Sequence, residues 1–128
     1  MKIVQFVGCV VLSLAIGQAW AQPVFIDVAD EDCSKTVVDS TGRTCEGKQP
    51  EDACRNRGQA VNWVVRPGGH AFEVSFPEGS PFGDDTACLT QSGQPCQIPD
   101  DTPNGDYRYD VRVDIPGCGW KDPRILVR

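Results

Sequence analysis

The chain has 128 residues, including 13 Gly, 10 Pro and 7 Cys, and its net charge at pH 7 is −6. A chain of this length has room for one domain with a modest core. The many turn-forming residues argue against a helical bundle or a Rossmann enzyme, and the negative charge argues against a nucleic-acid binder.

The first 21 residues have the pattern of a secretory signal peptide. Lys2 is followed by an apolar run at 3–16 and by the small-x-small site Ala19-Trp20-Ala21. The apolar run is shorter than the roughly 20 residues that a membrane span needs, so we expect no membrane insertion after cleavage. Residues 22–128 would then form a single domain, in the periplasm or secreted. Cleavage removes Lys2, Cys9 and Met1, which leaves six cysteines and a net charge of −7.

Six cysteines in an exported chain predict three disulfides. Sequence alone allows fifteen pairings. Local spacing favours Cys88 with Cys96 and Cys45 with Cys54, which leaves Cys33 for Cys118. No C-x2-C pair is present, which argues against a zinc site and against a thiol oxidoreductase.

The first half of the domain predicts two short strands and one helical turn. The strands are expected at residues 24–28 and 35–38, where apolar and β-branched residues gather. Residues 50–58 begin with Pro and two acids and end with Arg57-Gly58, a pattern typical of a short helix.

The second half predicts four strands, at residues 60–66, 72–76, 107–115 and 124–128. In residues 107–115, five apolar or aromatic residues alternate with four charged ones, as expected for a half-buried antiparallel strand. Asn104-Gly105 is a turn that leads into it. Residues 84–103 form a long loop that contains Cys88 and Cys96. The predicted fold is all-β, an antiparallel β-sandwich.

Several strand motifs resemble those of small bacterial proteins with a cupredoxin-like sandwich. They are VNWVV at 61–65, FEVSF at 72–76, PF at 81–82, YRYDVRV at 107–113 and DPRILV at 122–127. The resemblance covers about residues 60–127, and it implies a cupredoxin-like fold. An immunoglobulin-like sandwich would show similar patterning, so both topologies stay open.

The residues do not support the copper site that such a fold can carry. A blue-copper site needs two His, one Cys and usually an axial Met. The chain has one His, His70, and its one Met is removed with the signal. Residues 100–106 are a poor match to a calcium loop, because Val111 stands where a bidentate Glu is needed. We therefore expect no cofactor and no metal centre, although weak surface calcium stays open.

No catalytic constellation is apparent in the sequence. The one candidate base, His70, follows Pro67-Gly68-Gly69 in a turn, and no G-x-S-x-G motif is present. We therefore expect a non-enzymatic binding module that contacts a protein partner. The candidate contact residues are His70, Asp84, Asp85 and Trp120, on loops that we expect to gather at one end of the sandwich.

Two alternatives differ in how the domain would act. One is an inhibitor or immunity-like protein that docks acidic loops on a basic envelope hydrolase. The other is a structural, envelope-associated protein. Trp120 has two possible roles, since it either closes the end of the sandwich or presents an exposed anchor to a partner.

Overall fold

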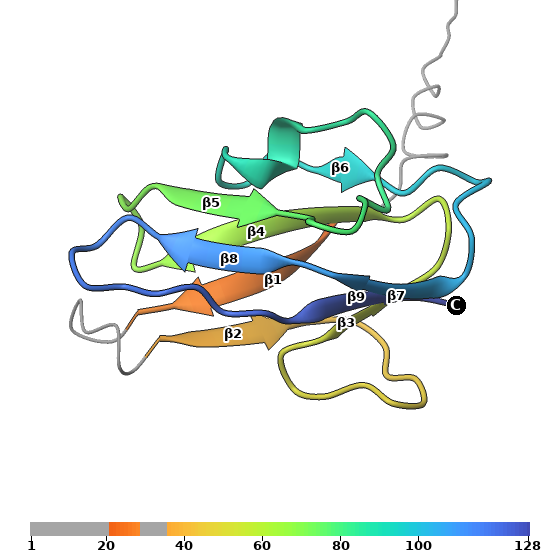
Figure 1. The fold of residues 1–128 in the computed structure, drawn as a ribbon, viewed down its shortest axis with the longest axis horizontal. Helices are drawn as coiled ribbons and strands as arrows, with labels where there is room; N and C mark the ends of the chain where they lie inside the picture. Colours follow the sequence, from red (N-terminus) through yellow and green to blue (C-terminus); the bar gives the residue numbers. More distant parts are fainter. Residues whose placement is uncertain (1–20, 29–35) are drawn as a thin grey trace, which may run out of the picture.

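The structure is a computed structural model of the chain and describes residues 21–28 and 36–128. Its described residues form nine strands and a single three-residue 3-10 turn, so the fold is nearly all β as predicted (Figure 1). The strands are β1 (Ala21–Asp27), β2 (Val37–Ser40), β3 (Ala53–Arg55), β4 (Ala60–Arg66), β5 (Phe72–Ser75), β6 (Cys96–Gln97), β7 (Gly105–Arg108), β8 (Asp110–Val113) and β9 (Arg124–Val127). The turn is η4 (Ala87–Leu89).

The strands form three hydrogen-bonded sheets, in the orders β2-β1-β4-β6, β3-β9-β7 and β5-β8. The expectation of purely antiparallel pairing is wrong, because β1 pairs parallel with β4 and β3 pairs parallel with β9. The reason is topological: the chain leaves β1, forms the edge strand β2, and returns to the other side of β1 only after β3. Strand periodicity in the sequence does not encode that direction.

The predicted strand at residues 107–115 is divided at Tyr109. β7 pairs with β9, whereas β8 pairs with β5. Tyr109 N–H donates to Pro123 O, and Val111 and Lys121 exchange backbone hydrogen bonds, which ties β8 to the segment before β9. The alternation of burial continues through the break, with Tyr109, Val111 and Val113 inside.

The predicted helix at residues 50–58 is also wrong. A turn at 50–51 leads into β3, whose three residues are all buried. Ala53 and Arg55 lie opposite Ile125 and Val127 of β9. Burial against the last strand outweighs the local helix signals, as tertiary contacts commonly do for short segments.

One core receives side chains from all three sheets. At its centre, Trp63 of β4 makes edge-on ring contacts with Phe76, Phe82 and Tyr109, at centroid distances of 6.4, 6.0 and 5.3 Å. The Trp63 indole N–H donates to the Tyr109 hydroxyl at 3.3 Å. Such T-shaped aromatic pairs stabilise a core beyond the area that they bury.

Replacing Tyr109 with Phe is expected to cost less stability at alkaline pH than at neutral pH. Near pH 7 the variant loses about 1 kcal/mol of unfolding free energy, because the Trp63 N–H loses its acceptor. Burial raises the pKa of Tyr109 well above its ordinary value. Unfolding therefore releases a proton above about pH 10, and the wild type loses stability as the pH rises through that value. Urea denaturation at pH 7 and pH 10.5 measures the difference in unfolding free energy between the wild type and Tyr109→Phe, which should narrow or reverse at the higher pH. An unchanged difference would contradict the prediction.

Two of the predicted disulfides are confirmed within the described residues, Cys45–Cys54 and Cys88–Cys96. The third predicted pair, Cys33 with Cys118, involves residue 33 and lies outside the described residues. Cys118 is itself disulfide-bonded. Disulfides are typical of proteins from oxidising compartments. The signal peptide at 1–21 also lies almost wholly outside the described residues.

Removing the Cys88–Cys96 disulfide is expected to destabilise the protein more than removing Cys45–Cys54. Both bridges close loops of similar length, which contributes about 2.5 kcal/mol each. Cys88 and Cys96 are both fully buried in the core, whereas Cys45 is partly exposed. Thermal unfolding of the two double Cys→Ala variants tests this, with a fall of roughly 10 °C or more expected for the Cys88/Cys96 pair. An equal or smaller fall than for the other variant would contradict it.

Candidate binding site

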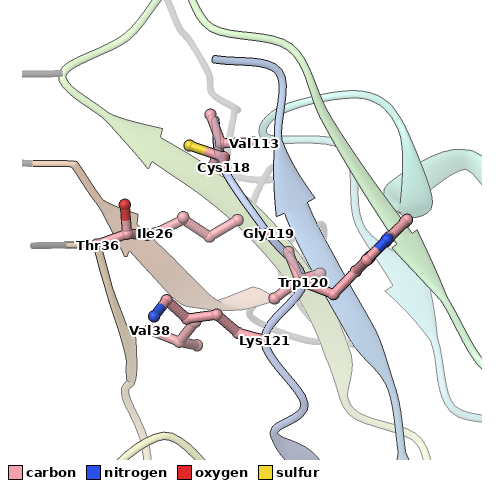
Figure 2. Close-up of a pocket in the computed structure, with 9 residues that line it drawn as sticks. Ile26, Thr36, Val38, Val113, Cys118, Gly119, Trp120 and Lys121 are labelled. Carbon is pink, nitrogen blue, oxygen red and sulfur yellow. The ribbon is translucent and has the colours of Figure 1, made fainter. Parts of the chain in front are cut away.

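The hollows of the surface gather beside the edge strand β2. One of them, about 410 Å³, lies between β2 and the segment before β9, and we call it the edge groove. Its lining residues are Thr36, Val37, Val38, Pro50, Glu51, Trp120, Lys121, Asp122 and Pro123. A smaller pocket of about 90 Å³ shares Thr36, Val38, Trp120 and Lys121 with it and reaches inward to core residues of β1 and β8 (Figure 2).

The floor of the groove is apolar because β2 alternates. Val38 is buried, whereas its neighbour Val37 is 56% exposed. The inner pocket is lined by Ile26, Val111 and Val113 in addition to Val38. The groove therefore gives a surface entry to the aliphatic side of the core.

Trp120 is the other large apolar residue exposed at this edge, with 49% of its surface accessible. Figure 2 shows its indole directed away from Ile26 and Val38, toward the outer face of β8. There the Arg112 guanidinium lies 4.9 Å from the ring centroid, and Arg112 also pairs with Glu73 at 3.5 Å. A cation held on one ring face fixes the indole while leaving part of it exposed. Of the two roles expected for Trp120, its exposure therefore fits an anchor for a partner and not a plug that closes the end of the sandwich.

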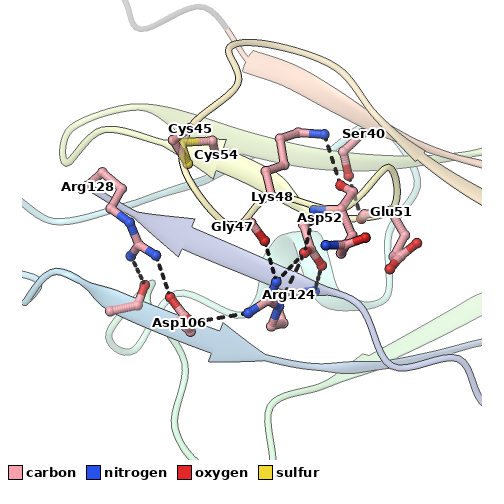
Figure 3. A network of polar contacts seen from close by, with 12 residues as sticks. Ser40, Cys45, Gly47, Lys48, Glu51, Asp52, Cys54, Asp106, Arg124 and Arg128 are labelled. Atoms are coloured by element: carbon pink, nitrogen blue, oxygen red, sulfur yellow. Dashed lines mark hydrogen bonds and ion pairs between the residues drawn. A yellow bond between two sulfur atoms is a disulfide. The ribbon is translucent and has the colours of Figure 1, made fainter.

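An ion-pair network fixes one end of the groove (Figure 3). Asp52 is buried, and its carboxylate accepts hydrogen bonds from the side chain of Arg124, at 2.6 and 3.2 Å, and from the Arg124 backbone N–H at 3.0 Å. This hydrogen bonding raises the pKa of Arg124. Ser40 Oγ donates to Glu51 O at 2.9 Å, which ties β2 to the same loop. The walls of the groove are thereby joined at Pro50 and Glu51.

The four residues predicted for binding do not form one cluster. Asp84 and Asp85 are exposed and precede η4, and Asp85 O lies 3.7 Å from Cys96 Sγ. Cys96 pairs with Val61 at the start of β4, whereas His70 lies beyond the end of β4 and is partly buried. Since β4 has seven residues, its ends lie roughly 20 Å apart. Only Trp120 lines the edge groove.

Sequence reasoning missed Val37, Glu51 and Asp122. The consecutive valines at 37 and 38 carried a signal, because a strand must turn one of the two outward. Glu51 and Asp122 carried none, since only the fold brings their loops together.

Among the described residues, no three His, Cys, Asp or Glu side chains lie close enough to hold a metal ion. Asp106, in the weak calcium-loop match, pairs with Arg124 and Arg128.

No model of a known protein family matches the chain, and no curated protein matches it in sequence. Within the described ranges, no helix is both long and apolar enough to cross a membrane.

Proposed function

We propose that this protein is an exported, non-enzymatic binding module that contacts a protein partner through the edge groove. The carrying observation is that Val37 and Trp120, both half-exposed, flank a hollow that opens onto the apolar core. Isolated exposed apolar residues are common, but a pair beside a preformed hollow is typical of an interaction site. The proposed contact with the partner therefore lies at the edge beside β2, and not on the loops at one end of the sandwich.

The proposed architecture is a β-sandwich, cupredoxin-like or immunoglobulin-like. One layer would be β2-β1-β4-β6. The other would join β5-β8 to β3-β9-β7, which is supported by the backbone hydrogen bonds from Tyr109 to Pro123 and between Val111 and Lys121. Side chains from both layers contribute to the one core. The edge groove would then be the open side of the sandwich.

Export to the periplasm or the medium is supported by the signal pattern and the disulfides.

The inhibitor alternative has its own observation in favour. Asp84 and Asp85 are exposed on a loop anchored by the Cys88–Cys96 disulfide, so two negative charges are presented on a fixed support. A basic hydrolase would be attracted to such a loop, with an affinity that falls with salt. The acidic loop and the edge groove are separate surfaces, so one experiment can distinguish them.

Site-specific photo-crosslinking tests the proposal. The protein, secreted from its full-length precursor, carries p-benzoylphenylalanine in place of Val37 in one variant and of Asp84 in a matched one. Both positions are exposed, so neither change should disturb the fold. We expect a discrete crosslinked partner from position 37 in the envelope or secreted fraction of the source cells. A partner crosslinked only from position 84, and lost in Asp84→Asn/Asp85→Asn, would establish the inhibitor alternative instead. Crosslinks from neither position would contradict both.

A further inference from the structure

The edge groove lies between two backbone edges. Among the strands of residues 21–28 and 36–128, β2 is the last of its sheet, with β1 on one side only. The opposite wall is the segment from Trp120 to Pro123, which is bonded to β8 on its other side. The hydrogen bonds on the far side of each wall fix which backbone groups point into the groove.

The orientation of β1 follows from two hydrogen bonds. Val28 N–H donates to Arg66 O on the β4 side at 2.8 Å, and Thr41 N–H donates to Pro23 O on the β2 side at 3.4 Å. Backbone polar groups of successive strand residues point to opposite sides. The β1 residues that face β2 are therefore Pro23, Phe25 and Asp27.

The orientation of β2 follows from this. Phe25 lies opposite Asp39, and Asp27 lies opposite Val37. Val37 and Asp39 thus direct their N–H and C=O groups to β1. The N–H and C=O groups of Val38 and Ser40 point the other way, to the free edge at the groove.

The opposite wall has the same property. Lys121 uses both its N–H and its C=O on Val111, at 2.9 and 2.8 Å. Because the backbone polar groups of successive extended residues point to opposite sides, the N–H and C=O of Asp122 point away from β8, to the groove side. The backbone N–H of Arg124, two residues later, does point to that side, where it donates to Asp52 Oδ1.

The side chains around the groove indicate the chemistry of an occupant. Glu51 and Asp122 on the rim outnumber Lys121, and Asp39 is exposed on β2. The chain as a whole is acidic, so another copy of it would be repelled, whereas a basic segment would be attracted. The inner pocket, lined by Ile26 and Val38, accepts an aliphatic side chain.

We propose that the edge groove binds an extended segment of a partner protein that adds as a strand to the free edge of β2. The segment alternates apolar residues, directed into the inner pocket, with basic residues beside Glu51 and Asp122. Unpaired backbone groups supply the affinity in such strand addition, and alternate side-chain pockets supply the specificity. This inference rests on the proposed function and adds to it the class and conformation of the ligand.

The test uses three eight-residue peptides with blocked ends and the 15N-labelled mature protein. The first alternates Lys and Val, the second alternates Glu and Val, and the third is the Lys-Val peptide with alternate backbone amides methylated. Two charge-matched variants accompany the wild type: Glu51→Lys/Asp122→Lys in the groove, and Asp84→Lys/Asp85→Lys at exposed positions outside it. Titrations are followed by amide chemical shifts and hydrogen exchange.

The Lys-Val peptide is expected to bind and to slow amide exchange at Val38, Ser40 and Asp122, leaving Val37 and Asp39 unchanged. The Glu-Val and methylated peptides are expected to bind at least about tenfold more weakly. Glu51→Lys/Asp122→Lys should weaken Lys-Val binding by about tenfold, since two attractive carboxylates on the rim are replaced by two repelling ammonium groups. Asp84→Lys/Asp85→Lys should change it less than about threefold, because these charges lie beyond β4, farther from the groove.

Three results would overturn strand addition: no binding of the Lys-Val peptide, equal binding of the methylated peptide, or equal weakening by both variants. Concentration-dependent protection of Val38 and Ser40 in the free protein would also overturn it, because a second copy would then occupy the edge. A position-37 crosslink combined with any of these results would leave the binding function standing and remove only the strand-addition mode.

Discussion

Replacing Asp52 with Asn is expected to lower the free energy of unfolding by about 3 kcal/mol, because hydrogen bonds to a buried carboxylate are lost and a buried backbone donor is left without an acceptor. The Asp52 side chain is 2% exposed, and it accepts hydrogen bonds from the Arg124 side chain and from the backbone N–H groups of Arg124 and Gln49. The asparagine amide would direct an N–H at one of these donors. Urea denaturation at pH 7 measures the loss.

Asp106→Asn is the matched control for that prediction. Asp106 also pairs with Arg124, at 3.1 Å, but its side chain is 46% exposed. Exposed pairs contribute at most about 1 kcal/mol. Equal losses for the two variants would show that burial of Asp52 does not matter. Since the Asp52–Arg124 pair holds the loop that carries Glu51 against the start of β9, we also expect Asp52→Asn to weaken Lys-Val peptide binding.

Replacing Arg55 with Ala is expected to have a similar effect, a loss of about 4 kcal/mol. Arg55 on β3 is fully buried. In the described part of the chain, its guanidinium donates to the carbonyl oxygens of Thr41, Cys54 and Gln22, at 2.7, 3.0 and 3.2 Å. Truncation would leave these carbonyls without their donor and create a cavity.

The comparison with Arg55→Met separates the contribution of the guanidinium hydrogen bonds from that of the side-chain volume. Burial lowers the pKa of Arg55 to about 10, which shows that its charge is held at a cost in desolvation. Met keeps much of the volume and removes the charge, so we expect Arg55→Met to recover about half of the stability lost in Arg55→Ala. The exposed Arg66→Ala is the surface control, expected to cost less than about 1 kcal/mol. A loss below about 1 kcal/mol for Arg55→Ala would contradict the structural role.

Much of the fold could be predicted from alternating side chains. Residues 60–66, 72–76 and 124–128 were predicted as strands within a residue or two of β4, β5 and β9. The failures share a cause. Residues 50–58 carry helix signals, yet β3 forms there because it pairs with β9, some seventy residues away. The break at Tyr109 has the same origin, since β7 and β8 pair with different strands.

The candidate site was mostly beyond prediction. Trp120 was identified because an aromatic residue beside two glycines is conspicuous in the sequence. Val37, Glu51 and Asp122 belong to three segments that come together only through the sheet order and the Asp52–Arg124 pair. Asp84, Asp85 and His70 were predicted to lie together, but β4 separates them.

The sequence by itself determined that the chain is mainly β and which of its side chains face inward. Period-two alternation is a local property of the sequence. The short loop spacing indicated two of the disulfides, although fifteen pairings were possible. Only the tertiary structure decided strand order, the parallel pairs and the position of the edge groove. These depend on which backbone edges meet, and backbone hydrogen-bonding groups are the same in every residue except proline. The unpaired edge of β2, on which the proposed ligand depends, is therefore a property of the fold and not of any motif.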